Sequence, residues 1–243
     1  MDITGRNICK SFHHKPVIKN VSISIPSGEI ICLLGPSGAG KTTLIRLLIG
    51  AIPTDEGEIR YGQTLIPNLA LLKKIGFMPQ NDAIYEDLSG TGNLSFFAEL
   101  YGMRKKDYMG RIDEVLRLVD LKEDSGKPVR EYSGGMKKRL SLAAALLHEP
   151  EVLLLDEPTV GIDPVLRKAI WVQLKKLKEQ GKTIIVSTHV MDEVTECDKA
   201  ALIYQGQLIQ YDTVSNLLSL TKSNKIEELF FLAADKKGGD AAC

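Results

Sequence analysis

The chain reads Gly35-Pro36-Ser37-Gly38-Ala39-Gly40-Lys41-Thr42-Thr43 immediately after the apolar run Ile30-Ile31-Cys32-Leu33-Leu34. Leucines at helical spacing follow, from Leu44 to Leu48. A strand, a glycine-rich turn and a helix in this order aim several backbone N–H groups and the positive end of the helix dipole at one point. In such a phosphate loop (Walker A motif), Lys41 reaches the β- and γ-phosphates and the Thr42 hydroxyl binds Mg²⁺. The sequence therefore predicts a nucleoside triphosphate site rather than an ordinary glycine-rich turn.

Charge and composition limit the kinds of partner and of cellular compartment that the chain suits. Lys plus Arg and Asp plus Glu number 31 each, so no overall basic field invites nucleic acid. The basic triplets 104–106 and 137–139 fall on helical patterns, where we interpret them as solvated helix faces. The four cysteines show no metal or redox spacing, which favours a reducing compartment.

The chain shows neither an apolar leader segment nor an apolar run long enough to cross a bilayer. We therefore expect a cytoplasmic protein, and any role at a membrane then requires a membrane-embedded partner.

The pattern of apolar residues predicts an α/β fold. Strands are expected at 3–9, 17–25 and 58–61, and helices dominate residues 82–149, the first of them capped by Thr91. Strands and helices then alternate at 152–155, 164–178 and 183–187, which is typical of parallel βαβ units. A hairpin turning at Gln205-Gly206 and helices at 213–220 and 225–234 follow, before a polar tail from Lys236 that we expect to be disordered.

Two carboxylates end the apolar run at 152–155, namely Asp156 and Glu157. The carboxyl end of a strand in a parallel sheet faces the ligand crevice. Asp156 is then placed to hold Mg²⁺, and Glu157 to orient and polarise an attacking water. The alternative is a buried strand with two solvated acids at its tip, but paired acids beside phosphates repel a nucleotide unless a metal is present.

Further motifs carry a family resemblance. Tyr132-Ser133-Gly134-Gly135-Met136 resembles the signature of ATP-binding-cassette (ABC) ATPases. Gln80 looks like the family's Gln loop, 161–163 like its Asp loop, and His189 like its switch histidine. Order and spacing match over residues 1 to about 211. The strings 134–139 and 93–97 look most like the branch that powers export through separate membrane subunits, including drug and antibiotic exporters.

The resemblance implies a set of roles. ATP and Mg²⁺ are the implied cofactors, with Thr42, Gln80 and Asp156 around the metal and with Glu157, His189 and Lys41 acting in catalysis. Ser133, Gly134 and Gly135 complete the ATP site of a second copy of the chain. The implied nucleotide-binding residues are Phe12 (stacked on adenine), Gly35, Pro36, Ser37, Gly38, Ala39, Gly40, Lys41, Thr42, Thr43, Gln80, Ser133, Gly134, Gly135 and Asp163.

The signature departs from the common family pattern at two positions. Tyr132 stands where Leu is usual, and Met136 where Gln is usual. Met136 loses an amide but leaves Ser133 and both glycines in place, while Tyr132 changes a packing position. Since Glu157 and His189 are both present, nothing marks the site as inactive.

The resulting expectation is a P-loop NTPase core sheet with an antiparallel β-subdomain and a helical subdomain at about 82–149. We expect residues 1–211 to form the nucleotide-binding domain, with 212–243 as a helical extension and tail. The function expected is ATP hydrolysis that drives a transporter, with a second copy and an integral membrane permease as partners and no nucleic acid. The permease is expected to bind at the groove between the core and the helical region, near Gln80 and the segment Ala83-Ile84-Tyr85. The exposed pair Ile84-Tyr85 suits an amphipathic docking helix, and the alternative is that the pair simply packs the subdomain.

Two other classes are weighed against this one. A soluble ABC-type ATPase could serve DNA repair, ribosomes or cofactor assembly, but too few residues separate Gly40 from Ser133 for the coiled-coil insertion of repair members. Ribosome-acting members usually carry two cassettes. A P-loop kinase or GTPase leaves Ser133-Gly134-Gly135 and His189 without a role.

Overall fold

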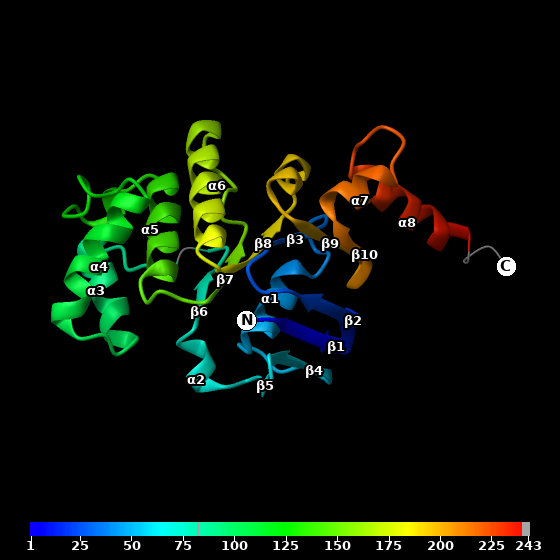
Figure 1. Cartoon of the computed structure of the whole chain (residues 1–243), viewed down its shortest axis with the longest axis horizontal. Helices are drawn as coiled ribbons and strands as arrows, with labels where there is room; N and C mark the ends of the chain where they lie inside the picture. The colour runs from blue at the N-terminus through cyan, green and yellow to red at the C-terminus, as the bar shows by residue number, and fades with distance from the viewer. Residues whose placement is uncertain (82, 240–243) are drawn as a thin grey trace. The chain divides into compact units, whose positions relative to one another are not determined.

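The computed structural model describes residues 1–81 and 83–239, which form two compact units (Figure 1). Unit 1 combines residues 1–67 with the residues from 185 onward, and unit 2 comprises residues 68–184. Strand β8 (Thr183–Thr188) passes from one unit to the other. The strands and helices together confirm the predicted α/β fold.

An antiparallel sheet in unit 1 confirms the predicted β-rich beginning. Its strand order is β2-β1-β4-β5, and its bounds are β1 Ile3–Phe12, β2 Lys15–Ile25, β4 Glu56–Tyr61 and β5 Thr64–Leu65. Ile3 pairs with Ile25 on one side and Tyr61 on the other. All three are almost wholly buried, because residues directly opposite one another on neighbouring strands lie on the same face of the sheet.

A second set of strands in unit 1 carries the phosphate loop. Strand β3 (Ile30–Leu34) pairs parallel with β9 (Lys199–Tyr204), and β9 pairs antiparallel with β10 (Gln207–Thr213). The five residues of β3 are buried, as an unbroken apolar run in a parallel sheet requires. The predicted hairpin is confirmed: Gln205 and Gly206 have φ of 48° and 80°, the left-handed values of a two-residue hairpin turn.

Four further elements complete unit 1. Helix α1 (Lys41–Ile49) follows the phosphate loop, and the short η2 (Met191–Glu196) follows β8. Helices α7 (Val214–Ser219) and α8 (Glu227–Gly239) are the last elements of the described part of the chain. Phe230 of α8 lies edge-on to Tyr204 at the end of β9, with ring centroids 6.4 Å apart. The C-terminal extension therefore packs on the strands of this unit.

Unit 2 holds the helical region and the strand that ends in two acids. Strands β6 (Ile75–Met78) and β7 (Val152–Asp156) pair in parallel. Helices α3 (Gly90–Leu100), α4 (Lys105–Leu118) and α5 (Gly134–Leu146) pack on one another (Figure 1). The other elements are α2 (Leu69–Leu72), η1 (Val129–Glu131) and α6 (Pro164–Glu179). A β-carbon at Gly76 would stand 2.2 Å from the Ala145 carbonyl oxygen, so a glycine lets α5 approach β6 closely.

Two predicted boundaries were wrong. Helix α3 is capped by Ser89 rather than Thr91, because the Ser89 hydroxyl accepts a hydrogen bond from the Gly92 N–H at 3.0 Å. Helix α8 continues through Gly239, where we expected a disordered tail from Lys236. Once a helical turn has formed, each further residue adds a hydrogen bond at little extra cost, which favours continuation of the helix. The rest of that tail, residues 240–243, lies outside the described residues.

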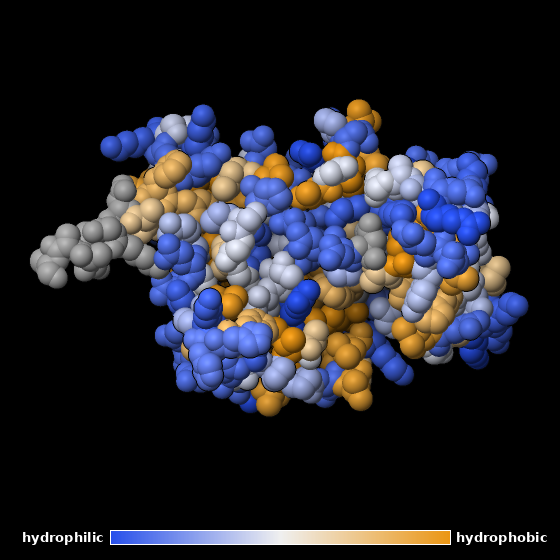
Figure 2. All heavy atoms as spheres, turned by 180° about the vertical axis from the view of Figure 1, so that it is seen from behind, coloured by the Kyte–Doolittle hydropathy of each residue, from blue (hydrophilic) through white to orange (hydrophobic). Residues whose placement is uncertain are grey.

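Among the described residues, no helix combines the length and the apolar character that a membrane span needs. Hydrophilic residues cover much of the face shown in Figure 2, with apolar residues between them.

Candidate functional site

The phosphate loop joins β3 to α1 in unit 1. Gly38 and Gly40 have φ of 78° and 106°, values that a residue with a β-carbon adopts only under strain. A β-carbon at Gly35 would stand 2.2 Å from the carbonyl oxygen of Ile203. Gly38 and Gly40 are thus required by the loop's own backbone conformation, and Gly35 by the close approach of strand β9. Pro36, Ser37 and Gly38 are exposed, so the outer side of the loop is open to a ligand.

Lys41 begins α1 and is only 5% exposed. Its ammonium donates to the carbonyl oxygens of Gly35 at 2.7 Å and Pro36 at 3.0 Å. The loop backbone therefore holds the cation over its own turn. Thr42 and Thr43, the next two residues of the helix, are half-buried.

The β9–β10 hairpin supports the phosphate loop from outside the motif. The Gly206 N–H donates to the Ala39 carbonyl at 3.0 Å, and the Lys19 N–H donates to the Gly206 carbonyl at 2.8 Å. A β-carbon at Gly206 would stand 2.2 Å from the Val17 carbonyl oxygen. The sequence predicted the hairpin turn but not this contact, because nothing local to 205–206 indicates which distant segment the turn meets.

Unit 1 also holds the predicted adenine contact and the switch histidine. Phe12 ends β1, is 41% exposed, and has the Lys10 ammonium 5.7 Å from its ring centroid. His189 is exposed directly after β8, which neighbours β3 in the sheet. The turn at His189 is fixed by Thr188, whose hydroxyl donates to Glu193 at 2.7 Å and accepts from the Val190 N–H at 3.0 Å.

Unit 2 holds the two acids at the end of β7. Asp156 and Glu157 are 1% and 8% exposed, so neither is the solvated acid of the alternative interpretation. The Gln80 side-chain amide donates to a Glu157 carboxylate oxygen at 3.0 Å. Glu157 has a φ of 53°, a left-handed value that is uncommon for a residue other than glycine. Such backbone outliers cluster at functional sites.

The signature segment forms the start of α5. The Ser133 hydroxyl accepts from the Met136 N–H at 3.2 Å and so caps the helix. Ser133 and Gly134 are exposed, and no acid stands in the first turn. Tyr132 is buried, and its hydroxyl donates to the Asp124 carbonyl at 2.8 Å, which confirms that it is a packing position. Burial also raises the pKa of the Tyr132 hydroxyl.

Asp163 begins α6. One of its carboxylate oxygens accepts from the N–H groups of Val165 and Leu166, at 3.1 and 3.0 Å. Pro164 occupies the first helical position, as predicted. Asp163 is therefore engaged as a helix cap, and a role toward nucleotide stays a prediction.

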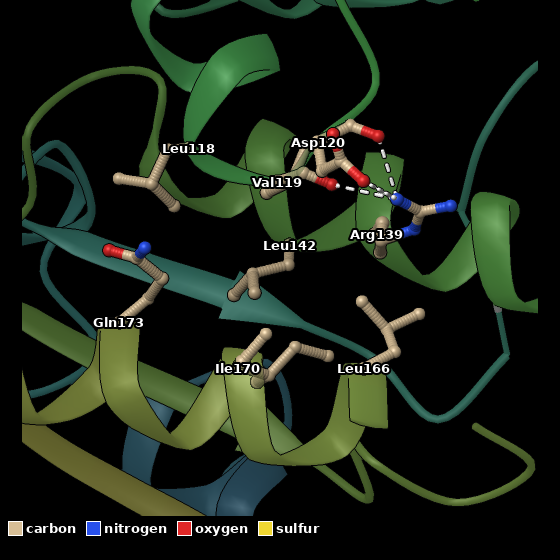
Figure 3. Close-up of a pocket in the computed structure, with 9 residues that line it drawn as sticks. Leu118, Val119, Asp120, Arg139, Leu142, Leu166, Ile170 and Gln173 are labelled. Carbon is tan, nitrogen blue, oxygen red and sulfur yellow. Dashed lines mark hydrogen bonds and ion pairs between the residues drawn. The ribbon is translucent and has the colours of Figure 1, made fainter. Parts of the chain in front are cut away.

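The basic triplet 137–139 is not the solvated face that we expected. Lys137 pairs with Glu86, and the Lys138 ammonium donates to the carbonyls of Gln80 and Glu157, both at 3.2 Å. Arg139 donates to the carbonyls of Val119 and Asp120 at 3.2 and 2.7 Å, beside an apolar hollow of about 50 Å³ (Figure 3). The three basic residues therefore make three different tertiary contacts, which their composition alone did not indicate.

The segment after Gln80 also differs from expectation. Residues 83–85 form no helix, and Ile84 is half-buried while Tyr85 is 51% exposed. The buried Asn93 side chain fixes this segment, since it accepts from the Tyr85 N–H at 2.7 Å and donates to the Tyr85 carbonyl at 2.9 Å. Tyr85 also lies edge-on to Phe96, with ring centroids 4.8 Å apart. The Asn93 side chain thus makes the hydrogen bonds with the Tyr85 backbone that a helix would otherwise supply, so no helix is needed here.

A family model described as ABC transporter matches residues 18–160. The chain belongs to the ABC transporter family. The linearmycin resistance ATP-binding protein LnrL of Bacillus subtilis is 40% identical to this ABC ATPase over 230 residues, covering 93% of this chain and 74% of that protein. The Nod factor export ATP-binding protein I of Sinorhizobium fredii is 40% identical over 206 residues, covering 84% of this chain and 60% of that protein.

Solved structures give the same fold for this ABC ATPase. A dimeric ATP-binding cassette in a post-hydrolysis state with ADP and phosphate has a TM-score of 0.81 and 25% identity, covering 87% of this chain and 98% of that chain. An ATP-binding subunit of an ABC transporter has a TM-score of 0.84 and 24% identity, covering 95% of this chain and 98% of that chain. The chain is thus a P-loop ATPase that binds and hydrolyses ATP.

Proposed function

We propose that this ABC ATPase is the cytoplasmic motor of an exporter, working as a pair of copies that enclose two ATP molecules head to tail. The observation that carries the proposal is the exposed start of α5 at Ser133 and Gly134, with no acid in the first turn. The first backbone N–H groups of a helix have no intrahelical partner. A helix start of this kind binds anions. The export direction rests on relatives whose names refer to linearmycin resistance and Nod factor export.

Separate residues serve nucleotide binding and hydrolysis. Residues 35–43 hold the phosphates, with Lys41 on the β- and γ-phosphates, and Phe12 stacks on adenine. Glu157 orients and polarises the attacking water, and His189 hydrogen-bonds the γ-phosphate. Water then attacks the γ-phosphorus in line, the bond to the β–γ bridging oxygen breaks, and ADP and phosphate leave. Ser133, Gly134 and Gly135 act on the ATP of the second copy.

The residues assigned to Mg²⁺ fit that ion chemically. Thr42 offers a hydroxyl, Asp156 a carboxylate and Gln80 an amide oxygen, and Mg²⁺ prefers oxygen ligands. The amide nitrogen of Gln80 is the atom engaged with Glu157, which leaves its oxygen for the metal. No cluster of three or more His, Cys, Asp or Glu that could hold a metal occurs in the described part of the chain. A small number of protein ligands is expected for Mg²⁺, because substrate phosphates and waters supply its other ligands. When bound, the ion supplies charge stabilisation at the β- and γ-phosphates.

A permease partner fits the exposed aromatic surface of unit 2. Tyr85, Leu88, Phe96 and Leu100 are 51%, 38%, 39% and 70% exposed. Exposed aromatic groups often anchor protein–protein interfaces, and larger exposed apolar patches mark interaction sites. The surface follows Gln80 closely in sequence, so a change at the metal has a short path to the permease. We propose that this surface grips the membrane subunit.

Removal of the metal tests the proposed chemistry. ATP turnover by the purified chain, followed by phosphate release, is expected to require Mg²⁺ and to stop when EDTA is added. Restoring excess Mg²⁺ is expected to restore turnover. Hydrolysis that persists in EDTA contradicts the assignment of Thr42, Gln80 and Asp156.

A further inference from the structure

Lys138, in the second turn of α5, makes a contact that the roles above leave unexplained. The ammonium of Lys138 donates two hydrogen bonds, one to the carbonyl oxygen of Gln80 and one to the carbonyl oxygen of Glu157. The donor–acceptor distance is 3.2 Å in each. These two residues are far apart in sequence, 58 and 19 positions from Lys138. One side chain of the signature helix therefore joins the backbones of the two residues that also meet through their side chains.

The backbone of Glu157 depends on such support. Its φ of 53° is left-handed, a conformation that a residue with a β-carbon keeps only when its surroundings hold it there. The Glu157 carbonyl accepts from the Val160 N–H at 3.4 Å and from Lys138 at 3.2 Å. A charged donor makes a stronger hydrogen bond than a neutral one. Lys138 thus supplies the shorter and stronger of these two bonds.

The other end of Glu157 is held by Gln80. The Gln80 amide donates to the Glu157 carboxylate at 3.0 Å, and Lys138 holds the Gln80 carbonyl in turn. Lys138, Gln80 and Glu157 therefore close a ring of three hydrogen bonds. The neighbouring Lys137 lies on the same helical turn but pairs with Glu86 instead.

We propose that Lys138 is a positioning residue for ATP hydrolysis. Its ammonium fixes the backbones of Glu157 and Gln80 against the signature helix, so that the Glu157 carboxylate is aimed at the attacking water. The inference rests on the proposed role of Glu157 as the group that polarises water. Lys138 acts through Glu157 and not on the nucleotide, so its loss affects kcat and leaves the KM for ATP nearly unchanged.

The test compares Lys138→Met with Lys138→Arg, Lys138→Gln and the matched control Lys137→Met. Each purified variant is assayed for kcat and KM for ATP, with thermal unfolding as the check on folding. A small misplacement of a catalytic group can cost about 100-fold, so we expect Lys138→Met to lower kcat about 10- to 100-fold. Lys138→Arg keeps a cationic donor and is expected to recover most of the rate. Lys137→Met is expected to keep the wild-type rate. Lys138→Gln gives a neutral donor and serves if Lys138→Met does not fold.

A double variant separates positioning from general structural damage. In the Glu157→Gln background, Lys138→Met is expected to leave the residual turnover unchanged, because the carboxylate that it positions is already gone. A further drop by the same factor as in the wild type overturns the proposal, as does a Lys138→Met kcat within twofold of wild type. If Glu157→Gln itself turns over at the wild-type rate, the proposed role of Glu157 fails and this inference fails with it. If Glu157→Gln is inactive and Lys138→Met is normal, only this inference fails.

Discussion

The side-chain amide of Gln80 donates a hydrogen bond to the Glu157 carboxylate at a distance of 3.0 Å, although 77 positions separate the two residues. The contact links the residue assigned to the metal with the residue assigned to the attacking water. Because the amide nitrogen is the donor, the amide oxygen stays available as a metal ligand. A movement of Gln80 toward Mg²⁺ therefore changes the surroundings of the Glu157 carboxylate.

The first prediction concerns Lys41. Replacing it with Ala removes the cation that the phosphate loop holds over its own turn. Hydrogen bonds to charged groups are worth about 1.5–3 kcal/mol, so we expect ATP affinity to fall about 10- to 100-fold. Calorimetric titration measures the affinity, and circular dichroism checks that the fold is intact. An unchanged affinity removes Lys41 from the site.

The second prediction concerns the start of α5. Ser133→Arg places a long side chain at an exposed helix start. If this helix meets the nucleotide of the second copy, the variant binds ATP about as well as wild type but does not hydrolyse it. Titration and phosphate release measure the two quantities separately. Equal losses of binding and turnover indicate that the signature contacts its own nucleotide, contrary to the proposal.

The third prediction concerns the permease surface. The double replacement of Ile84 and Tyr85 by Ser removes the exposed Tyr85 ring from this surface, together with the half-buried Ile84 beside it. We expect the protein to leave membranes that contain its permease and to keep its ATPase activity in solution. Sedimentation of membranes with the bound protein measures the first effect. Retained association contradicts this docking site, and loss of the solution activity favours a packing role for the pair.

The fourth prediction concerns pH. His148 stacks on Tyr101, with ring centroids 3.8 Å apart, and its Nε2 donates to the Ile75 carbonyl at 3.0 Å. Burial lowers the pKa of His148, and Arg111 and Lys182 lower it further. The unfolded chain has an ordinary histidine pKa of about 6.5 and so takes up more protons than the folded chain as pH falls below that value.

The contribution of His148 to the free energy of unfolding should therefore be constant above about pH 6.5 and should decline below that pH. Urea unfolding between pH 7.5 and pH 5 measures the decline. His148→Gln keeps an amide donor toward Ile75 but cannot protonate, so its stability should fall less over the same range. Parallel declines in the two proteins contradict this origin of the pH dependence.

Local sequence predicted the features that local physics determines. The phosphate loop needs glycines at positions of positive φ, the acids end an apolar strand, and Gln205-Gly206 suits a two-residue turn. Each of these signals is contained within a few residues. They were sufficient to predict most of the strands, most of the helices and the family resemblance, but not the short strand β5.

The contacts that hold the candidate site could not be predicted in the same way. Lys138 appeared only as part of a basic triplet, because its partners lie far away in the sequence. Asn93 gave no sign that it would satisfy the backbone of Tyr85 and replace a helix there. In both cases the partner is a backbone carbonyl or N–H group, and a backbone group leaves no mark in the sequence.

The measurement that tests the account most directly is made on Glu157→Gln. The amide keeps the size of the side chain and removes the carboxylate that polarises water. General-base catalysis is worth about 100-fold or more, so turnover should fall by at least that factor while ATP affinity is kept. With hydrolysis blocked, light scattering in saturating ATP and Mg²⁺ should show the mass of a pair of chains. A Glu157→Gln protein that hydrolyses ATP at the wild-type rate contradicts the account.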